Sequence, residues 1–224
     1  MMWDCVDVGL AYRDLRKRVL ALVDTLSSEQ WEMVTPHCPE WTVRQTLAHL
    51  AGVIDDAINN NMVGVTTPKW TAAHIDKRAT MTGPEIALEW ATWAPLVEAR
   101  ATERGMALSQ LVFDAATHEH DLRHALGVPG ARASNAVVVG IGFLSSRLTA
   151  RPGGSPIRLI VDDVEVVPAD GSHPTLQTSA FDALRSFASR RTKAQIAVLG
   201  WSAEPGDVMD LVIPFGYPSV AIVE

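Results

Sequence analysis

The sequence predicts a mainly α-helical protein, with a four-helix bundle over residues 1–150 and a small α/β region over residues 151–224. Two observations support this fold class. Apolar residues recur at helical spacing through the first part of the chain. The pattern then changes at the segment 151–156, which is rich in glycine and proline, and short runs of β-branched residues follow it. Because such short strands are not stable alone, we expect the second region to pack against the bundle.

Four long helices are expected in the first region, and residues that favour helix ends set their limits. These helices cover residues 7–26, 42–58, 84–105 and 106–126. A capping box begins the second helix at Thr42, Pro84 fits the first turn of the third, and Gly127 closes the fourth. A fifth helix is expected over residues 136–148. Residues 59–83 show little periodicity, which predicts a long irregular connection.

The second region is expected to begin with a β-hairpin. Its two strands cover residues 157–161 and 164–167. Residues 162–163 form the turn between these strands. A helix capped by Thr178 should follow, and a second capping box lies at Thr192. We expect residues 212–218 to be irregular.

Composition narrows the class of protein. The net charge of −7 argues against binding to nucleic acids or anionic membranes, since both attract clustered lysine and arginine. No apolar run approaches the roughly 20 residues of a membrane span, and the first residues lack the features of a signal peptide. The two cysteines, Cys5 and Cys38, do not form a disulfide framework. We therefore expect a cytoplasmic protein, as a monomer or a homodimer, with no nucleic-acid or membrane partner.

Asp114, His118 and His49 form a candidate metal site. Asp114 and His118 are four residues apart, so one helix presents both side chains on the same face. Asp121 falls on the same strip, which faces the interior edge of the bundle, where bundle metal sites are built. With His49 from a second helix, three protein ligands would leave one position open, as in catalytic sites. The alternative is three unrelated polar residues on helix flanks, because this spacing often arises by chance.

Other polar residues on the fourth helix have simpler interpretations. His120 and His124 share the four-residue spacing but lie on another side of the helix, so we expect a solvated face. Glu119 falls within the apolar strip. It is either a buried carboxylate or a side chain that reaches solvent at the helix edge, and we expect the second. Cys38 could be a reactive thiol, but nothing nearby in sequence supplies a base, so we expect it to be inert.

Three segments carry a resemblance to a known family. Residues 38–52, CPEWTVRQTLAHLAG, resemble the CPxWTVRDLLAHLAG segment of the mycothiol-dependent maleylpyruvate isomerase N-terminal family, which comprises actinobacterial members of the DinB-like superfamily. Residues 118–127, HEHDLRHALG, resemble its HxxDLRRALG segment. Residues 181–201 are similar to its C-terminal GRRSRAQ…LDW stretch. The resemblance implies a DinB-like four-helix bundle with a small C-terminal α/β part.

The resemblance also implies a metal and a thiol cofactor. It assigns a divalent metal, with Zn²⁺ as the expected ion, to His49, Asp114 and His118. Asp114 stands where the isomerases carry Glu, and its side chain is one methylene shorter, so the metal must lie closer to the helix or be held less tightly. Ser189 replaces a glycine of the family. The cofactor implied is mycothiol, a low-molecular-weight thiol.

The function expected is therefore that of a metal-dependent, mycothiol-dependent isomerase or thiol transferase acting on a small electrophilic substrate. Asp121 is the candidate proton carrier or ligand orienter. Arg190 is a candidate for contact with a substrate carboxylate and Arg191 for cofactor binding, although a basic doublet is usually solvated. Two alternatives stay open: a non-catalytic metal- or ligand-binding DinB-like protein, and a hydrolase that uses metal-bound water. Fold resemblance does not separate them.

Overall fold

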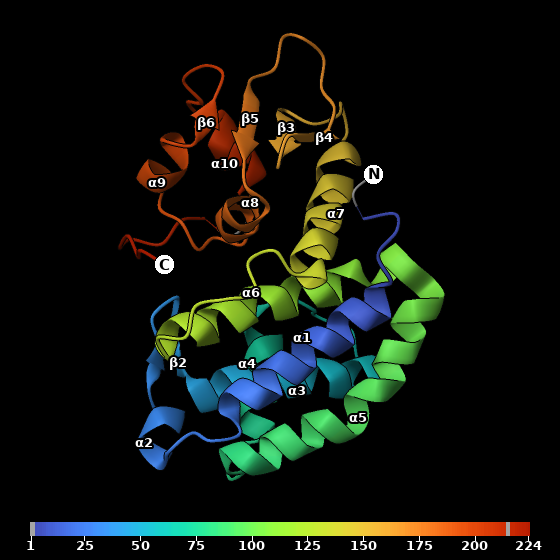
Figure 1. The fold of residues 1–224 in the computed structure, drawn as a ribbon, viewed down its shortest axis with the longest axis vertical. Helices are drawn as coiled ribbons and strands as arrows, with labels where there is room; N and C mark the ends of the chain where they lie inside the picture. The colour runs from blue at the N-terminus through green and yellow to red at the C-terminus, as the bar shows by residue number, and fades with distance from the viewer. Residues whose placement is uncertain (1–2, 214–215) are drawn as a thin grey trace.

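The computed structural model describes residues 3–213 and 216–224. Four long helices form a bundle (Figure 1): α1 (Val8–Val23), α3 (Val43–Asn59), α5 (Gly83–Arg104) and α6 (Ser109–Ala125). Helices α1 and α3 both pack against α5, and α6 packs against α1 and α3. A small sheet region follows at the C-terminal end, so the predicted mainly α fold with a C-terminal α/β part is confirmed. None of the described helices is both long enough and apolar enough to cross a bilayer.

The predicted helix ends correspond to observed caps. The Thr42 side chain accepts a hydrogen bond from the backbone of Gln45, whose side chain bonds back to Thr42, so this capping box is confirmed. Pro84 lies in the first turn of α5, behind a further capping box that begins at Thr82. The fourth helix begins later than expected, because a short 3₁₀ turn, η1 (Gly105–Leu108), precedes it.

Two connections contain elements that the sequence did not predict. After α2 (Ser28–Trp31), the chain forms an antiparallel hairpin of β1 (Val34–Thr35) with β2 (Cys38–Thr42). The segment expected to be irregular contains α4 (Pro68–Lys77), capped by Thr67. Helix α4 buries only one residue, His74, so its sequence carries no apolar stripe that would reveal it.

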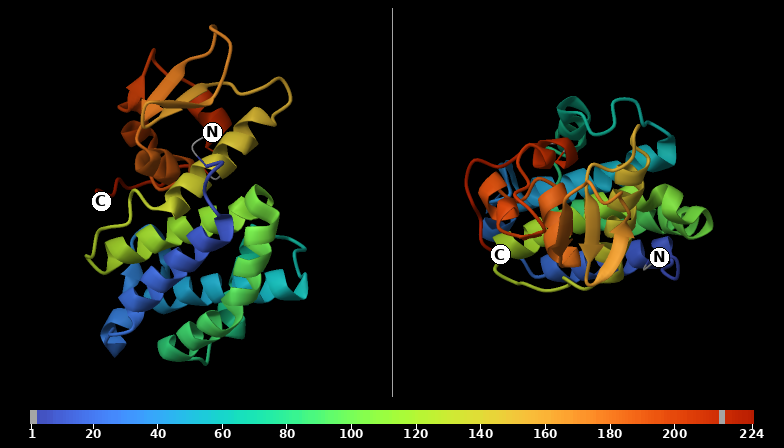
Figure 2. Two further views of the ribbon diagram at one scale, coloured as in Figure 1. Left: turned by 45° about the vertical axis from the view of Figure 1, so that its right-hand side comes forward. Right: turned by 90° about the horizontal axis from the view of Figure 1, so that it is seen from above.

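The C-terminal part lies on one side of the bundle, and α7 (Asn135–Thr149) runs between the two (Figures 1 and 2). Its sheet has the order β4-β3-β5-β6. Strands β3 (Arg158–Val161) and β4 (Val164–Val167) form the predicted hairpin, and Asp162 and Asp163 take the positive φ angles, 47° and 64°, that such a tight turn requires. Strands β5 (Thr175–Thr178) and β6 (Gly200–Trp201) were not predicted.

Short helices complete this part: α8 (Ala180–Phe187), α9 (Lys193–Ala197) and α10 (Val208–Val212). Helix α8 is capped by Ser179 rather than by its neighbour Thr178, and the capping box at Thr192 is confirmed. The expected irregular segment 212–218 overlaps the end of α10, and positions 214–215 lie outside the described residues.

Buried contacts join the C-terminal part to the helices. Helix α8 and strand β4 both pack against α7, and the Ser145 hydroxyl of α7 donates a hydrogen bond to the carbonyl of Val166 at 2.5 Å. Arg185 of α8 is fully buried and donates to the Thr117 carbonyl of α6 at 3.0 Å. Helix α8 therefore brings charged groups against α6. The division of the chain into two regions at residue 150 stays a prediction. Helix α7 ends one residue before it, at Thr149.

Candidate metal centre

The three residues predicted as metal ligands lie together. His49 comes from α3, and Asp114 and His118 come from successive turns of α6. His49 Nε2 is 3.3 Å from Asp114 Oδ2, and His118 Nε2 is 3.8 Å from Asp114 Oδ1. The ligand atoms of all three residues lie within 4.8 Å of one another. Ligands held about 2.0–2.1 Å from a tetrahedral Zn²⁺ are roughly 3.4 Å apart, so this spacing suits a common ion.

One oxygen of the half-buried Asp114 carboxylate lacks a hydrogen-bond partner in the part of the chain that the structure describes, whereas its Oδ1 lies 3.5 Å from His49 Nε2. Its Oδ2 atom is buried and makes no hydrogen bond among the described residues, although His49 Nε2 lies 3.3 Å away. Burial alone would raise the pKa of Asp114, but His49 and His118 outweigh it and bring the pKa to about 2. The group is thus ionised at neutral pH. A buried anionic oxygen between two imidazoles fits a divalent cation.

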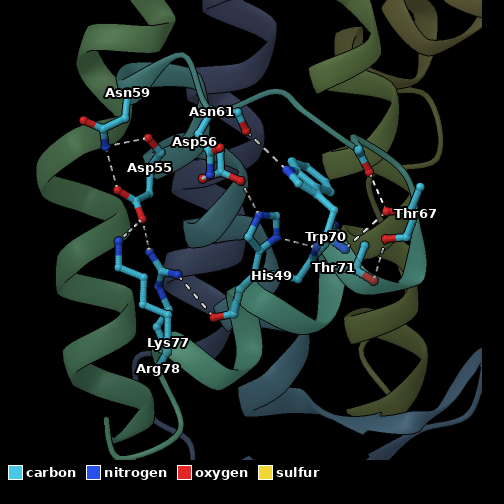
Figure 3. Close-up of polar contacts among 12 residues, drawn as sticks. His49, Asp55, Asp56, Asn59, Asn61, Thr67, Trp70, Thr71, Lys77 and Arg78 are labelled. Carbon is cyan, nitrogen blue, oxygen red and sulfur yellow. Dashed lines mark hydrogen bonds and ion pairs between the residues drawn. The ribbon is translucent and has the colours of Figure 1, made fainter.

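A second layer of residues orients His49. Its Nδ1 atom lies 3.1 Å from Nδ1 of His74 on α4, and His74 Nε2 lies 2.9 Å from Asp56 Oδ2. Asn61 and Trp70 extend this network (Figure 3). The Asp56 carboxylate accepts a hydrogen bond from the Asn61 side chain, and the Trp70 indole donates one to the Asn61 carbonyl. Burial lowers the pKa of His74 despite the nearby carboxylate. Sequence reasoning missed His74 because it missed α4.

His118 is supported by Asp121 on its other side. His118 Nδ1 lies 3.1 Å from Asp121 Oδ2, and Asp121 is fully buried. Arg185 Nη2 and Arg190 Nη2 lie 2.7 Å and 2.8 Å from its two oxygens. Burial would raise the pKa of Asp121, but the two guanidinium groups hold it well below its ordinary value. The predicted orienter therefore lies where it can fix the His118 ring.

The two neighbouring arginines, Arg190 and Arg191, are mostly buried, whereas a basic doublet is usually solvated. The side chains of Arg190 and Arg191 are only 16% and 11% exposed. Arg190 contacts Asp121, which lies next to His118, whereas Arg191 Nη1 donates to the Glu224 carboxylate at 2.6 Å. Sequence reasoning missed Arg185, although an arginine inside the apolar pattern of α8 is a signal for a buried ion pair.

Cys38 lies beside the same network. Its Sγ atom is 3.1 Å from Arg190 Nη2 and 3.7 Å from Asp121 Oδ2. Burial, with the negative charge of Asp121, raises the pKa of the Cys38 thiol to about 12. This environment favours the inert interpretation.

Two expectations for polar residues of α6 were wrong. His120 is 4% exposed, not solvated, because the C-terminal part covers it and the Phe181 ring lies 4.8 Å away. Glu119 does not reach solvent. It is fully buried, because Arg18 Nη2 and Arg123 Nη2 lie 2.7 Å and 3.0 Å from its oxygens and compensate its charge.

The candidate centre opens on a cavity. Trp41 lies over the two histidine ligands, with its ring 5.2 Å from that of His49 and 5.7 Å from that of His118. A cavity of about 530 Å³ reaches Asp114 from the side of Trp70. The site is therefore walled by aromatic rings and accessible to a small molecule.

A model of the family described as the mycothiol maleylpyruvate isomerase N-terminal domain matches residues 12–138 of the chain. The match runs from α1 to the start of α7 and includes the three clustered residues. The C-terminal part, with Arg185, Arg190 and Arg191, lies beyond it. No curated protein and no solved structure matches the chain.

Proposed function

Because this chain belongs to the mycothiol maleylpyruvate isomerase N-terminal domain family, we propose that it is a metal-dependent enzyme that joins mycothiol, transiently or permanently, to a small electrophile. The observation that carries the proposal is the buried, unpartnered oxygen of Asp114 between His49 and His118. These three residues would hold one divalent ion, for which we propose Zn²⁺. Three protein ligands leave a position for an exogenous group.

The thiol of this reaction comes from outside the chain. Cys38 lies beside the centre, but its raised pKa keeps it protonated near neutral pH. When bound, the ion supplies the positive charge that stabilises a thiolate. Addition of the thiolate to an activated double bond, rotation and departure of the thiol would give an isomerase. Retention of the adduct would give a transferase.

The surrounding residues position the ligands. His74, backed by Asp56, fixes the ring of His49, and Asp121 fixes the ring of His118. A carboxylate held by two guanidinium groups is a poor base, so we propose Asp121 as an orienter rather than as a proton carrier. Arg190 then serves by holding Asp121, and a substrate carboxylate would have to compete for it.

The role predicted for Arg191, binding of the thiol cofactor, conflicts with the ion pair that this residue already makes. Its guanidinium is paired with Glu224 at 2.6 Å, so a thiol cofactor could use it only after that carboxylate moves. The role predicted for Arg191 therefore depends on a rearrangement of the last residues described.

The proposal is tested by metal-dependent conjugation of mycothiol to a panel of electrophiles, repeated with glutathione. We expect the Zn²⁺-loaded protein to accelerate the mycothiol reaction, and Asp114→Asn to lose at least about 100-fold of that rate. Asp114→Glu, which introduces the family's residue, is the matched control and should keep activity. If the protein binds metal tightly but accelerates conjugation of neither mycothiol nor glutathione, it is a non-catalytic member of the family. If it instead releases a hydrolysed product, the hydrolase becomes the favoured function.

A further inference from the structure

The cavity that reaches Asp114 is larger and more apolar than a small polar substrate needs. It lies between α3, α5 and α6, with the segment after α3 and Trp70 of α4 closing one side. Its volume of about 530 Å³ falls in the range of pockets for drug-sized ligands. Ten of its sixteen lining residues are apolar, and they include Val53, Ile58, Val65, Val97, Leu108 and Leu111. Such a lining favours a ligand with an extended apolar body.

Two arginines line the same cavity at its exposed side. Arg100 and Arg104 are four residues apart on α5, so their side chains lie on one face of the helix. Arg100 donates to the Ala57 carbonyl at 3.2 Å, and neither guanidinium pairs with a carboxylate among the described residues. Both residues are exposed, whereas Val53 and Val97 deeper in the cavity are buried. Two uncompensated guanidinium groups at the mouth of an apolar cavity favour an anionic head group there.

We propose that this cavity binds the electrophilic substrate, and that the substrate is an apolar molecule ending in a carboxylate. This inference rests on the proposed function and specifies its substrate class. The carboxylate contacts Arg100 and Arg104 at the mouth, and the apolar body fills the space between α3, α5 and α6. The reactive carbon then lies at the inner end, beside Asp114.

Binding of simple probes tests the proposal without thiol, metal or turnover. Decanoate supplies an apolar body with a carboxylate, decanol removes the charge, and propionate removes the body. We expect calorimetry on the full chain to show decanoate binding at least about tenfold more tightly than either of the others. The Arg100→Gln/Arg104→Gln double variant should lose about tenfold in decanoate affinity and none in decanol affinity.

Controls separate the possible outcomes. Arg147→Gln, which alters an exposed arginine of α7 that does not line the cavity, should bind decanoate as the unaltered protein does. The substitutions lie at exposed positions, and circular dichroism checks that each variant is folded. Equal affinity for decanoate in the double variant and the unaltered protein, or no decanoate binding, would overturn the inference. His49→Ala should still bind decanoate, so loss of the metal function is distinguishable from failure of this proposal.

Discussion

At the scale of the residue, the short side chain of Asp114 is compatible with the proposed ligand set. The oxygens of Asp114 already lie 3.3 Å from His49 and 3.8 Å from His118, so the side chain of Asp is long enough in this bundle. Only small movements of the three side chains would bring their ligand atoms to about 2.1 Å from a bound ion. The substitution of Asp for the family's Glu is therefore compatible with a metal centre.

The two cysteines should differ sharply in reactivity. Cys5 is exposed, whereas burial and Asp121 raise the pKa of Cys38 to about 12. At pH 8 we expect iodoacetamide to modify one thiol per native chain quickly, and Cys5→Ser protein to react at least about 100-fold more slowly. Mass spectrometry of labelled peptides measures both sites. Rapid modification of Cys38 in folded Cys5→Ser protein would show that the site activates this thiol.

Local sequence predicted the proposed metal ligands but not the residues that contact them. Asp114 and His118 are related by helical spacing, His49 was the candidate from a second helix, and the resemblance of residues 38–52 to a known family supported it. Arg185, by contrast, lies 64 residues from the Asp121 it holds. No periodic pattern reports such a distant pair, because only the packing of α8 on α7 and α6 brings it together.

At the scale of the element, helix α4 contributes one buried side chain to the core of the candidate site. Its only buried residue, His74, packs against α3 at Gly52 and touches His49. A Cβ atom at Gly52 would lie 2.3 Å from His74 Cγ, so only glycine permits this approach.

Gly52→Ala should therefore destabilise the protein. Alanine normally favours a helix by about 1 kcal/mol over glycine, but displacing His74 should outweigh this and give a net loss of about 1–3 kcal/mol. Urea denaturation measures the change, and metal titration should show about tenfold weaker binding because His49 loses its support. Gly171→Ala is the control, since nothing lies within 4 Å of its added Cβ. A Gly52→Ala protein as stable as the original would mean that α4 does not pack this way.

The elements predicted from the sequence are those that bury a continuous apolar face. Helices α1, α3, α5 and α6 carry apolar stripes and caps, so their positions were apparent from the sequence. Helix α4 buries one residue, and β6 spans only Gly200–Trp201. Elements this small or this exposed take their structure from tertiary contacts, which local patterns do not contain.

At the scale of the whole molecule, the C-terminal part completes the centre electrostatically. Asp121 of the bundle is held by Arg185 and Arg190, and Arg185 also holds Glu224 at 2.7 Å. Alternating charges thus run from the last described residue to His118. Without this part, Asp121 would lose both guanidinium partners and keep only His118, 3.1 Å away.

Glu224 should stabilise the fold in a pH-dependent way. Burial would raise its pKa, but His37, Arg185 and Arg191 hold the pKa well below the ordinary 4.5. A depressed pKa contributes stability above pH 4.5 that is lost as the pH falls. Glu224→Gln should therefore cost about 3 kcal/mol of unfolding free energy at pH 7, and the cost should shrink by about 2 kcal/mol at pH 3.

Chemical denaturation of both proteins across this pH range measures the difference directly. Glu204→Gln, at an exposed glutamate, is the matched control and should leave stability and its pH dependence unchanged. A difference between Glu224→Gln and the original protein that stays constant from pH 7 to pH 3 would show that the buried carboxylate is not held as described.

The most direct test of the metal centre is the metal content of the purified protein. Elemental analysis after equilibration with Zn²⁺ should find about one ion per chain, because two buried histidines and one half-buried carboxylate form the proposed ligand set. His49→Ala and Asp114→Asn should each remove that ion, while His173→Ala, at a histidine of the C-terminal part, should retain it. Equal metal in the original protein and in His49→Ala would contradict the assignment of this centre.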